Sequence, residues 1–203
     1  GGTIVTGFDV RHVHCEGGQI ASIGGVDESG EWHELMGDYF FSTMPMKELI
    51  HAMDAEIPEN VKEVSEGLQY RDFITVGMLL KKLKIESEDR SRKLIEDIWI
   101  YIQEPDVLAG RLQIFKNWSP AMVADQENVW IGVEYFCYES DDLWKKADGE
   151  MADFARAELQ KIGMIDGGDL LDWTVLRMPK TYPAYFGTYS RFAELRAYLD
   201  TFE

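Results

Sequence analysis

The hydrophobic pattern of the first forty residues predicts short antiparallel strands. Apolar and polar residues alternate there in brief runs, and turn sequences such as Glu-Gly-Gly-Gln at positions 16–19 separate the runs. A period of two is typical of half-buried strands, and glycine readily takes the positive φ of a tight turn. We therefore expect a β-meander with strands over residues 3–5, 9–15, 20–26, 32–36 and 38–41.

Helical spacing follows at four places. Pro45 suits the first turn of a helix, and apolar residues recur every three or four positions behind it. A second short helix is expected over residues 60–68. Ser140, followed by two aspartates, predicts the start of a long helix that ends at Gly163, and Ser190 predicts the start of the last helix.

The remaining segments predict a sheet. Residues 73–80 are almost continuously apolar, as expected for a central strand covered on both faces. Residues 97–103 alternate strictly, with isoleucines on one face and aromatic or polar residues on the other. Further strands are expected over residues 111–116, 130–138 and 170–178, with an exposed charged connection over 81–96 and an irregular extended segment over 179–186.

These elements predict an α+β fold, with a largely antiparallel sheet, helices packed on one side of it, and the N-terminal β-meander. The 203 residues suffice for one large domain or two small ones. A net charge of −17 disfavours nucleic acid and anionic membranes as partners, because both need a basic surface. No apolar run is long enough for a membrane span and no signal peptide is visible, so a cytoplasmic location is expected.

The stretch over residues 110–138 concentrates chemically versatile side chains in two predicted strands. Glu134 lies in the middle of the second strand, where burying a carboxylate without a partner is costly. Arg111 in the first strand is a candidate partner, and a solvent-exposed position for Glu134 is the alternative. We expect these two strands to form the floor of a ligand pocket.

Rings, cations and an amide in and around this stretch predict a substrate-binding site. Arginine and lysine can hold an anion, aromatic rings can stack on a flat ring or a sugar, and an amide can bond hydroxyl groups. The candidate substrate-binding residues are Trp99, Tyr101, Arg111, Asn117, Trp118, Lys180, Tyr182 and Tyr185.

Signals for catalysis by side chains or metals are absent from the sequence. It contains no G-x-G-x-x-G, P-loop, G-x-S-x-G or zinc signature. His12 and His14 share a strand face but no third metal ligand is evident, so no metal site is predicted. Cys15 and Cys137 have no metal or nucleophile spacing and are interpreted as reduced, buried thiols. We assign no catalytic residue.

Six segments of the chain carry a family resemblance through their order and spacing. They are residues 42–49 (STMPMKEL), 68–76 (LQYRDFITV), 97–107 (DIWIYIQEPDV), 110–123 (GRLQIFKNWSPAMV), 134–137 (EYFC) and 177–185 (RMPKTYPAY). Together they resemble the flavin-dependent amine-oxidase superfamily, and within it bacterial proteins of the UDP-galactopyranose mutase and protoporphyrinogen-oxidase-like type. The resemblance covers most of the chain. Lys116 and Thr181 depart from the asparagine and alanine expected at their positions.

The resemblance implies that the chain is an internal piece of a larger FAD-dependent protein. The N-terminal Rossmann unit and the C-terminal FAD segment would lie outside these residues, and the remainder of the parent polypeptide would be the chain's partner. Residues 1–44 would be part of a split FAD-binding domain, and residues 45–203 the substrate-binding domain. The implied cofactor-binding residues are Val10, near the adenosine half of FAD, with Ser42, Met44 and Pro45.

The same resemblance implies a small-molecule substrate, with a nucleotide-sugar as the first hypothesis. An amine, porphyrinogen or carotenoid-type oxidase fragment is one alternative, and a non-catalytic interaction module is another. Because the pyrophosphate-binding turn is missing from the sequence, we expect the chain alone to retain little FAD and to be inactive.

Overall fold

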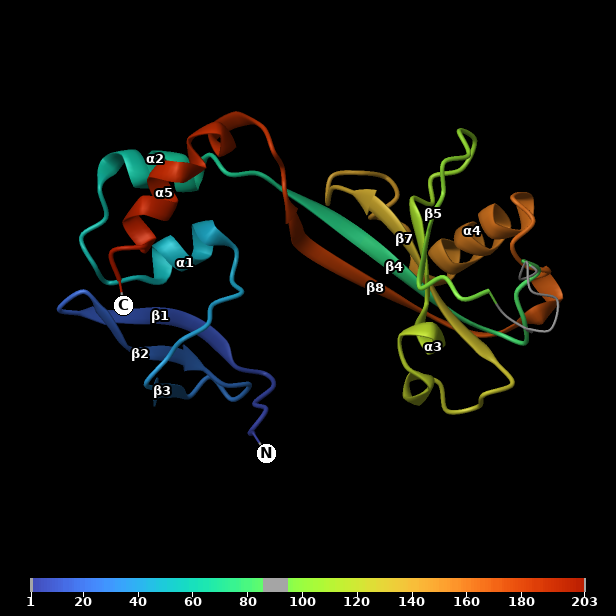
Figure 1. Ribbon diagram of the computed structural model, residues 1–203, viewed down its shortest axis with the longest axis horizontal. Helices are drawn as coiled ribbons and strands as arrows, with labels where there is room; N and C mark the ends of the chain where they lie inside the picture. The colour runs from blue at the N-terminus through green and yellow to red at the C-terminus, as the bar shows by residue number, and fades with distance from the viewer. Residues whose placement is uncertain (1, 86–94, 203) are drawn as a thin grey trace. The chain divides into compact units, whose positions relative to one another are not determined.

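The computed structural model describes residues 2–85 and 95–202, and the chain forms two compact units. The first unit contains Gly1–Gln69 and Pro183–Glu203, and the second contains Tyr70–Tyr182 (Figure 1). The helices that follow the meander pack against one another and against the last helix of the chain, so they belong to the first unit.

The first unit combines a three-stranded sheet with short helices. Its strands follow one another in antiparallel order, which confirms the predicted meander. Gly17 and Gly18 form the first turn with φ of 61° and 83°, values that glycine adopts without strain. The elements are β1 (Asp9–Glu16), β2 (Gln19–Val26), β3 (Trp32–Met36), α1 (Met46–Ala52), α2 (Glu59–Glu66), η3 (Gly187–Arg191) and α5 (Phe192–Leu199).

The second unit is a five-stranded sheet with one long helix. Its strand order is β5-β6-β7-β4-β8, so β5 and β8 form the edges. The predicted α+β class, with a largely antiparallel sheet and helices on one side, is confirmed. The elements are β4 (Tyr70–Leu80), β5 (Trp99–Tyr101), β6 (Arg111–Ile114), α3 (Phe115–Trp118), η1 (Pro120–Met122), β7 (Val129–Cys137), α4 (Asp148–Lys161), η2 (Gly167–Asp169) and β8 (Leu170–Pro183).

The core of the second unit lies between the sheet and α4. Alternation along β4 and β7 sends every second side chain to the helix-covered face. Methionine, alanine and leucine side chains of α4 complete this core. Its fully buried members include Ile74, Val76, Met78, Ile131, Val133, Tyr135, Met151, Ala155 and Leu159. The opposite face of the sheet is therefore the one left for other contacts.

Two predicted strands of the first unit are wrong. Residues 3–5 and 38–41 form no strand in the described structure, and Tyr39 and Phe41 are exposed instead of buried. Neither segment has a ladder partner among the described residues, and an apolar composition alone cannot supply one.

The predicted helix start at Ser140 is also wrong. The carboxylate of Asp141 accepts a hydrogen bond from the Tyr138 amide at 2.8 Å, so it closes a turn instead of capping a helix. The helix α4 begins at Asp148, with Ala147 as its N-cap.

Three other limits differ from prediction. The first strand of the 110–138 stretch ends at Ile114, where α3 begins, and the last helix begins at Phe192, after a 3₁₀ turn that contains Ser190. The strand β8 continues to Pro183, through residues that were expected to be irregular. Most of the predicted charged connection over 81–96 lies outside the described residues, which resume at residue 95.

Candidate functional site

The face of the five-stranded sheet opposite α4 carries the predicted ligand-binding chemistry. Tyr101 on β5 lies opposite Arg111 on β6, which in turn lies opposite Glu134 on β7. Trp99 and Gln113 form the next pair along β5 and β6. Register partners in neighbouring strands point to the same face of a sheet, so these side chains form one row.

Arg111 and Glu134 form a buried ion pair in this row. The Arg111 Nε donates to Glu134 Oε2 at 2.5 Å, and the Gln113 side-chain amide donates to the other carboxylate oxygen. Glu134 is 0% exposed and Arg111 is 8% exposed. Burial alone disfavours the charged guanidinium, but the hydrogen bonds to Glu134 and Tyr182 outweigh it and raise the pKa of Arg111.

Aromatic rings surround the Arg111 guanidinium. Its carbon lies 4.6 Å from the ring centre of Trp99, 5.8 Å from that of Tyr101 and 5.9 Å from that of Phe136. The Tyr182 hydroxyl lies 3.3 Å from the guanidinium Nη2. Such contacts stabilise a cation and fix its orientation. We call Trp99, Tyr101, Arg111, Glu134, Phe136 and Tyr182 the arginine cluster.

Trp118 extends the aromatic surface beside the arginine cluster. Its ring meets the Trp99 ring edge to face, with 5.3 Å between the centres. Both rings and that of Tyr101 remain substantially exposed. The structure thus brings together five of the eight predicted substrate-binding residues, and it leaves three rings open to a flat ligand.

The other three predicted residues have different surroundings. The Asn117 amide donates to the carbonyl oxygens of Ile95 and Asp97, each at 2.8 Å, and so holds the segment that leads into β5. Lys180 lies in β8 with an unusual φ of 55°. Tyr185 belongs to the first unit, where its ring packs edge-on against Tyr189.

Sequence reasoning missed Phe136 as a member of the arginine cluster. Phe136 pairs in register with Phe73 and lies two residues beyond Glu134 on the same face. Gly110 leaves room for its ring, because a Cβ at position 110 would lie 2.9 Å from the Phe136 ring carbons. The alternation of β7 was a usable signal, since it places Glu134 and Phe136 on one face.

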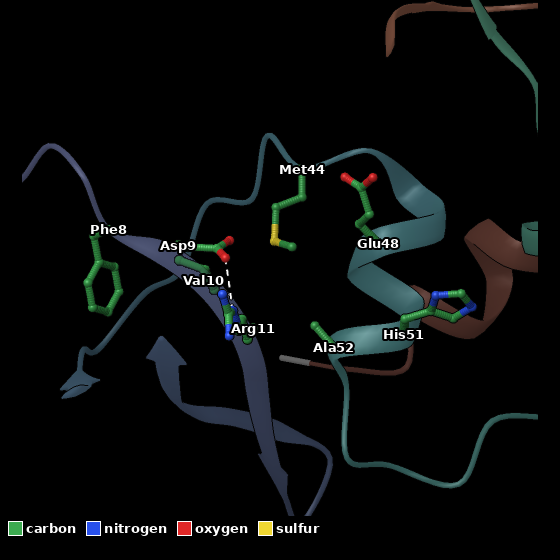
Figure 2. Close-up of a pocket in the computed structure, with 8 residues that line it drawn as sticks. All are labelled: Phe8, Asp9, Val10, Arg11, Met44, Glu48, His51 and Ala52. Carbon is green, nitrogen blue, oxygen red and sulfur yellow. Dashed lines mark hydrogen bonds and ion pairs between the residues drawn. The ribbon is translucent and has the colours of Figure 1, made fainter. Parts of the chain in front are cut away.

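A cavity of about 480 Å³ lies in the first unit, between the start of β1 and α1. Figure 2 shows Met44 between the strand and the helix, with Glu48, His51 and Ala52 on the helix side. The strand side of the cavity is formed by Phe8, Asp9, Val10 and Arg11. The Arg11 guanidinium forms an ion pair with the Asp9 carboxylate at 2.9 Å.

Two of the four predicted cofactor-binding residues, Val10 and Met44, line this cavity. Ser42 and Pro45 flank Met44 in the chain without lining it. The Ser42 hydroxyl accepts a hydrogen bond from the Met44 amide at 3.3 Å, and Pro45 is the N-cap of α1. Sequence reasoning missed Phe8 and Glu48, which only the packing of α1 beside β1 brings to this place.

His12 and His14 share a carboxylate that the sequence did not reveal. Asp54 Oδ2 lies 2.6 Å from His14 Nδ1 and 3.5 Å from His12 Nε2, while Asp54 Oδ1 accepts from the Cys15 amide at 2.7 Å. The hydrogen bond to Asp54 raises the pKa of His14. Asp54 follows α1 directly, so these bonds tie the helix to β1 and have a structural role.

A second acidic group forms the turn between β2 and β3. Asp27, Glu31 and His33 present possible ligand atoms within 4.8 Å of one another. The Asp27 carboxylate already accepts hydrogen bonds from the amides of Ser29 and Glu31, and it lies 2.8 Å from His33 Nε2. These contacts indicate that Asp27, Glu31 and His33 stabilise a tight turn.

Comparison with known proteins identifies the fold. No family model matches the sequence, and no curated protein matches it. A crystal structure of reduced UDP-galactopyranose mutase is similar over 94% of this chain, with a TM-score of 0.63 and 16% identity. Putrescine oxidase bound to putrescine is similar over 92%, with a TM-score of 0.58 and 10% identity.

A third similar structure is assigned as a protoporphyrinogen oxidase from Exiguobacterium sp. 255-15, with 94% of this chain covered, a TM-score of 0.53 and 16% identity. The match covers only 37%, 39% and 38% of the three proteins in turn, so the chain spans about two fifths of their length. The chain therefore has the fold of one part of oxidases and mutases. Across the described ranges, no helix has both the length and the apolar character needed to cross a membrane.

Proposed function

We propose that this chain supplies the substrate-binding sheet and part of the cofactor-binding domain of an FAD-dependent oxidoreductase or mutase. The observation that carries this proposal is the sheet face opposite α4, where exposed rings surround a buried ion pair. The fold likeness to oxidases and a mutase supports this assignment, as does the fraction of those proteins that the chain spans. The rest of the parent polypeptide would supply the pyrophosphate-binding turn.

The residues of the first unit suit the adenosine half of FAD. Phe8, Val10 and Met44 offer apolar walls to an adenine ring, and Glu48 offers a carboxylate to ribose hydroxyls. Ser42 and Pro45 would fix the backbone beside Met44. When bound, FAD supplies the redox or covalent chemistry, and the protein supplies binding and orientation.

A nucleotide-sugar is the substrate that the sequence resemblance implies. Trp99, Tyr101 and Trp118 would stack on its rings, and the Asn117 side-chain oxygen and the Tyr182 hydroxyl would bond its hydroxyl groups. Its diphosphate needs cations, and Glu134 already compensates the charge of Arg111. With Arg111, Lys180 is the cation that the resemblance implies for the diphosphate.

The compensated charge of Arg111 favours a second candidate substrate class, a flat molecule of low charge. Of the alternative substrates, a carotenoid-type compound, which is conjugated and uncharged, belongs to this class. Three exposed rings beside a neutral ion pair offer stacking area without a net positive field.

Calorimetric titration of the parent polypeptide with a UDP-sugar and with a flat, uncharged conjugated compound tests the proposal. We expect Trp99→Ala to weaken binding of the accepted ligand about tenfold, as loss of a stacking ring does. Trp173→Ala is the matched control, because Trp173 is also an exposed tryptophan of the second unit but lies outside the arginine cluster. Equal effects of the two variants, or no binding of either ligand, would contradict the proposal.

A further inference from the structure

The first unit carries a second surface that its own residues leave open. Trp32, Leu35, Met36, Tyr39 and Phe41 lie within ten consecutive residues and are all exposed; we call them the 32–41 surface. The exposed fraction is 77% for Met36, 86% for Tyr39 and 94% for Phe41. Single exposed apolar residues are common, but such a run marks an interaction site.

The strand at the start of this surface has a free edge. Among the described residues, β3 pairs with β2 alone, and it lies at the outer side of the meander in Figure 1. Proteins protect free edges with lysines, prolines or bulges. Residues 32–41 (WHELMGDYFF) contain no lysine, arginine or proline, although the chain as a whole has a net charge of −17. The edge is therefore suited to pairing.

One of the two carboxylates of this stretch is bound within the sheet. The Ser22 hydroxyl donates to the carboxylate of Glu34, so this side chain is held against the sheet by the neighbouring strand. At about 200 Å² for each fully exposed large side chain, Met36, Tyr39 and Phe41 together expose roughly 500 Å². Trp32 shares its strand face with Met36 and extends this area towards the ~800 Å² that one partner buries in a standard interface.

We propose that the 32–41 surface is the face on which the remainder of the parent polypeptide packs, with a strand or apolar segment of that remainder against β3. This inference rests on the proposed function, which makes the chain one part of a longer protein. The similar solved structures contain this fold in about two fifths of their length, so they hold a large amount of further polypeptide. A segment of the same polypeptide has a high effective concentration at this face, which a second copy lacks.

The test uses the sequence that flanks this chain in its parent gene, expressed as a separate polypeptide and mixed with the 203-residue chain. Association is measured by calorimetry, bound flavin by absorbance, and protection of residues 32–41 by amide hydrogen exchange. Met36→Glu and Phe41→Glu introduce a charge into the surface. Gln19→Glu adds the same charge at an exposed polar position at the start of β2, and serves as the control.

We expect association of the wild-type chain with the flanking polypeptide to protect residues 32–41 from exchange. Met36→Glu and Phe41→Glu should each weaken this association at least about tenfold, and Gln19→Glu should change it less than about twofold. Unchanged melting temperatures of the isolated variants would show that the exposed substitutions leave the fold intact. If all variants associate equally and flavin is bound, the 32–41 surface is not the contact and the inference fails, while the proposed function stands.

Two further outcomes also decide the matter. Absence of both association and flavin for the wild-type chain would overturn the proposed function itself. Self-association of the isolated chain that Met36→Glu abolishes, together with undiminished binding of the flanking polypeptide, would make a second copy the occupant and overturn the inference.

Discussion

The guanidinium of Arg111 and the carboxylate of Glu134 face each other across β6 and β7, with 2.5 Å between Nε and Oε2. Both residues are buried on the sheet face opposite α4. A buried ion pair of this kind adds little to stability compared with apolar residues, but each partner depends on the other. Its value to the site is to hold Trp99 and Tyr101 around a fixed centre.

We predict that Glu134→Leu lowers the free energy of unfolding by about 3–5 kcal/mol, because it leaves the Arg111 charge buried without a partner. The double variant Arg111→Met/Glu134→Leu should lose much less than the sum of the two single variants. Urea unfolding of all four proteins measures this coupling. Additive losses would show that the two side chains do not stabilise each other.

A glycine in the meander is predicted to be intolerant of a methyl group. A Cβ at Gly25 would overlap the Asp9 carbonyl oxygen of the paired strand and lie 2.9 Å from Phe8 Cζ. Gly25→Ala should therefore cost about 1–3 kcal/mol, because backbone atoms cannot move aside. Gly149→Ala in α4 meets no atom within 4 Å and should stabilise by roughly 0.5–1 kcal/mol. Thermal unfolding that showed the same sign for both would contradict this account.

The pH dependence of stability is predicted to include Glu194. Hydrogen bonds from Arg191, at 2.7 and 3.1 Å, and from Asn60, at 2.8 Å, lower the pKa of Glu194 to about 2. A lowered pKa in the folded state means that the stabilisation is complete above the ordinary pKa and is lost as the pH falls towards 2. The stability difference between wild type and Glu194→Gln should shrink from pH 5 to pH 2.5 in urea titrations. A constant difference would show that this carboxylate is not linked to folding.

The thiol of Cys137 is predicted to be unreactive in the folded protein. Burial, assisted by Asp141 and Asp72, raises the pKa of Cys137 to about 11, so little thiolate exists near neutral pH. Iodoacetamide at pH 8 should modify Cys137 only after denaturation, as mass spectrometry can measure. Modification of the native protein at a rate close to that of the unfolded chain would show that the strand β7 opens readily.

Alternation made much of the sheet predictable. The strict pattern over residues 97–103 gave β5 its two faces, and the mid-strand position of Glu134 pointed to Arg111 before any contact was known. These inferences hold because the period of a strand depends only on local geometry. Elements without a period, such as the segment around Tyr39, depend on partners that local sequence does not reveal.

The prolines of β8 illustrate the limit of local rules. Pro179 and Pro183 led us to expect an irregular segment, yet β8 runs to residue 183. It is an edge strand, where a missing amide hydrogen can face away from the ladder. Whether a strand lies at the edge or in the centre of a sheet depends on the strand order, which cannot be read from the local sequence. The cavity around Val10 and Met44 is a similar case, since it arises from the packing of α1 beside β1.

The flavin content of the purified parent polypeptide, compared with that of this chain alone, tests the central claim most directly. The account predicts one FAD per parent polypeptide, measured by flavin absorbance after release of the cofactor, and far less than one on the isolated chain. Stoichiometric flavin on the isolated chain would contradict the assignment of the pyrophosphate-binding turn to the remainder. A parent polypeptide that binds no flavin would contradict the proposed function as a whole.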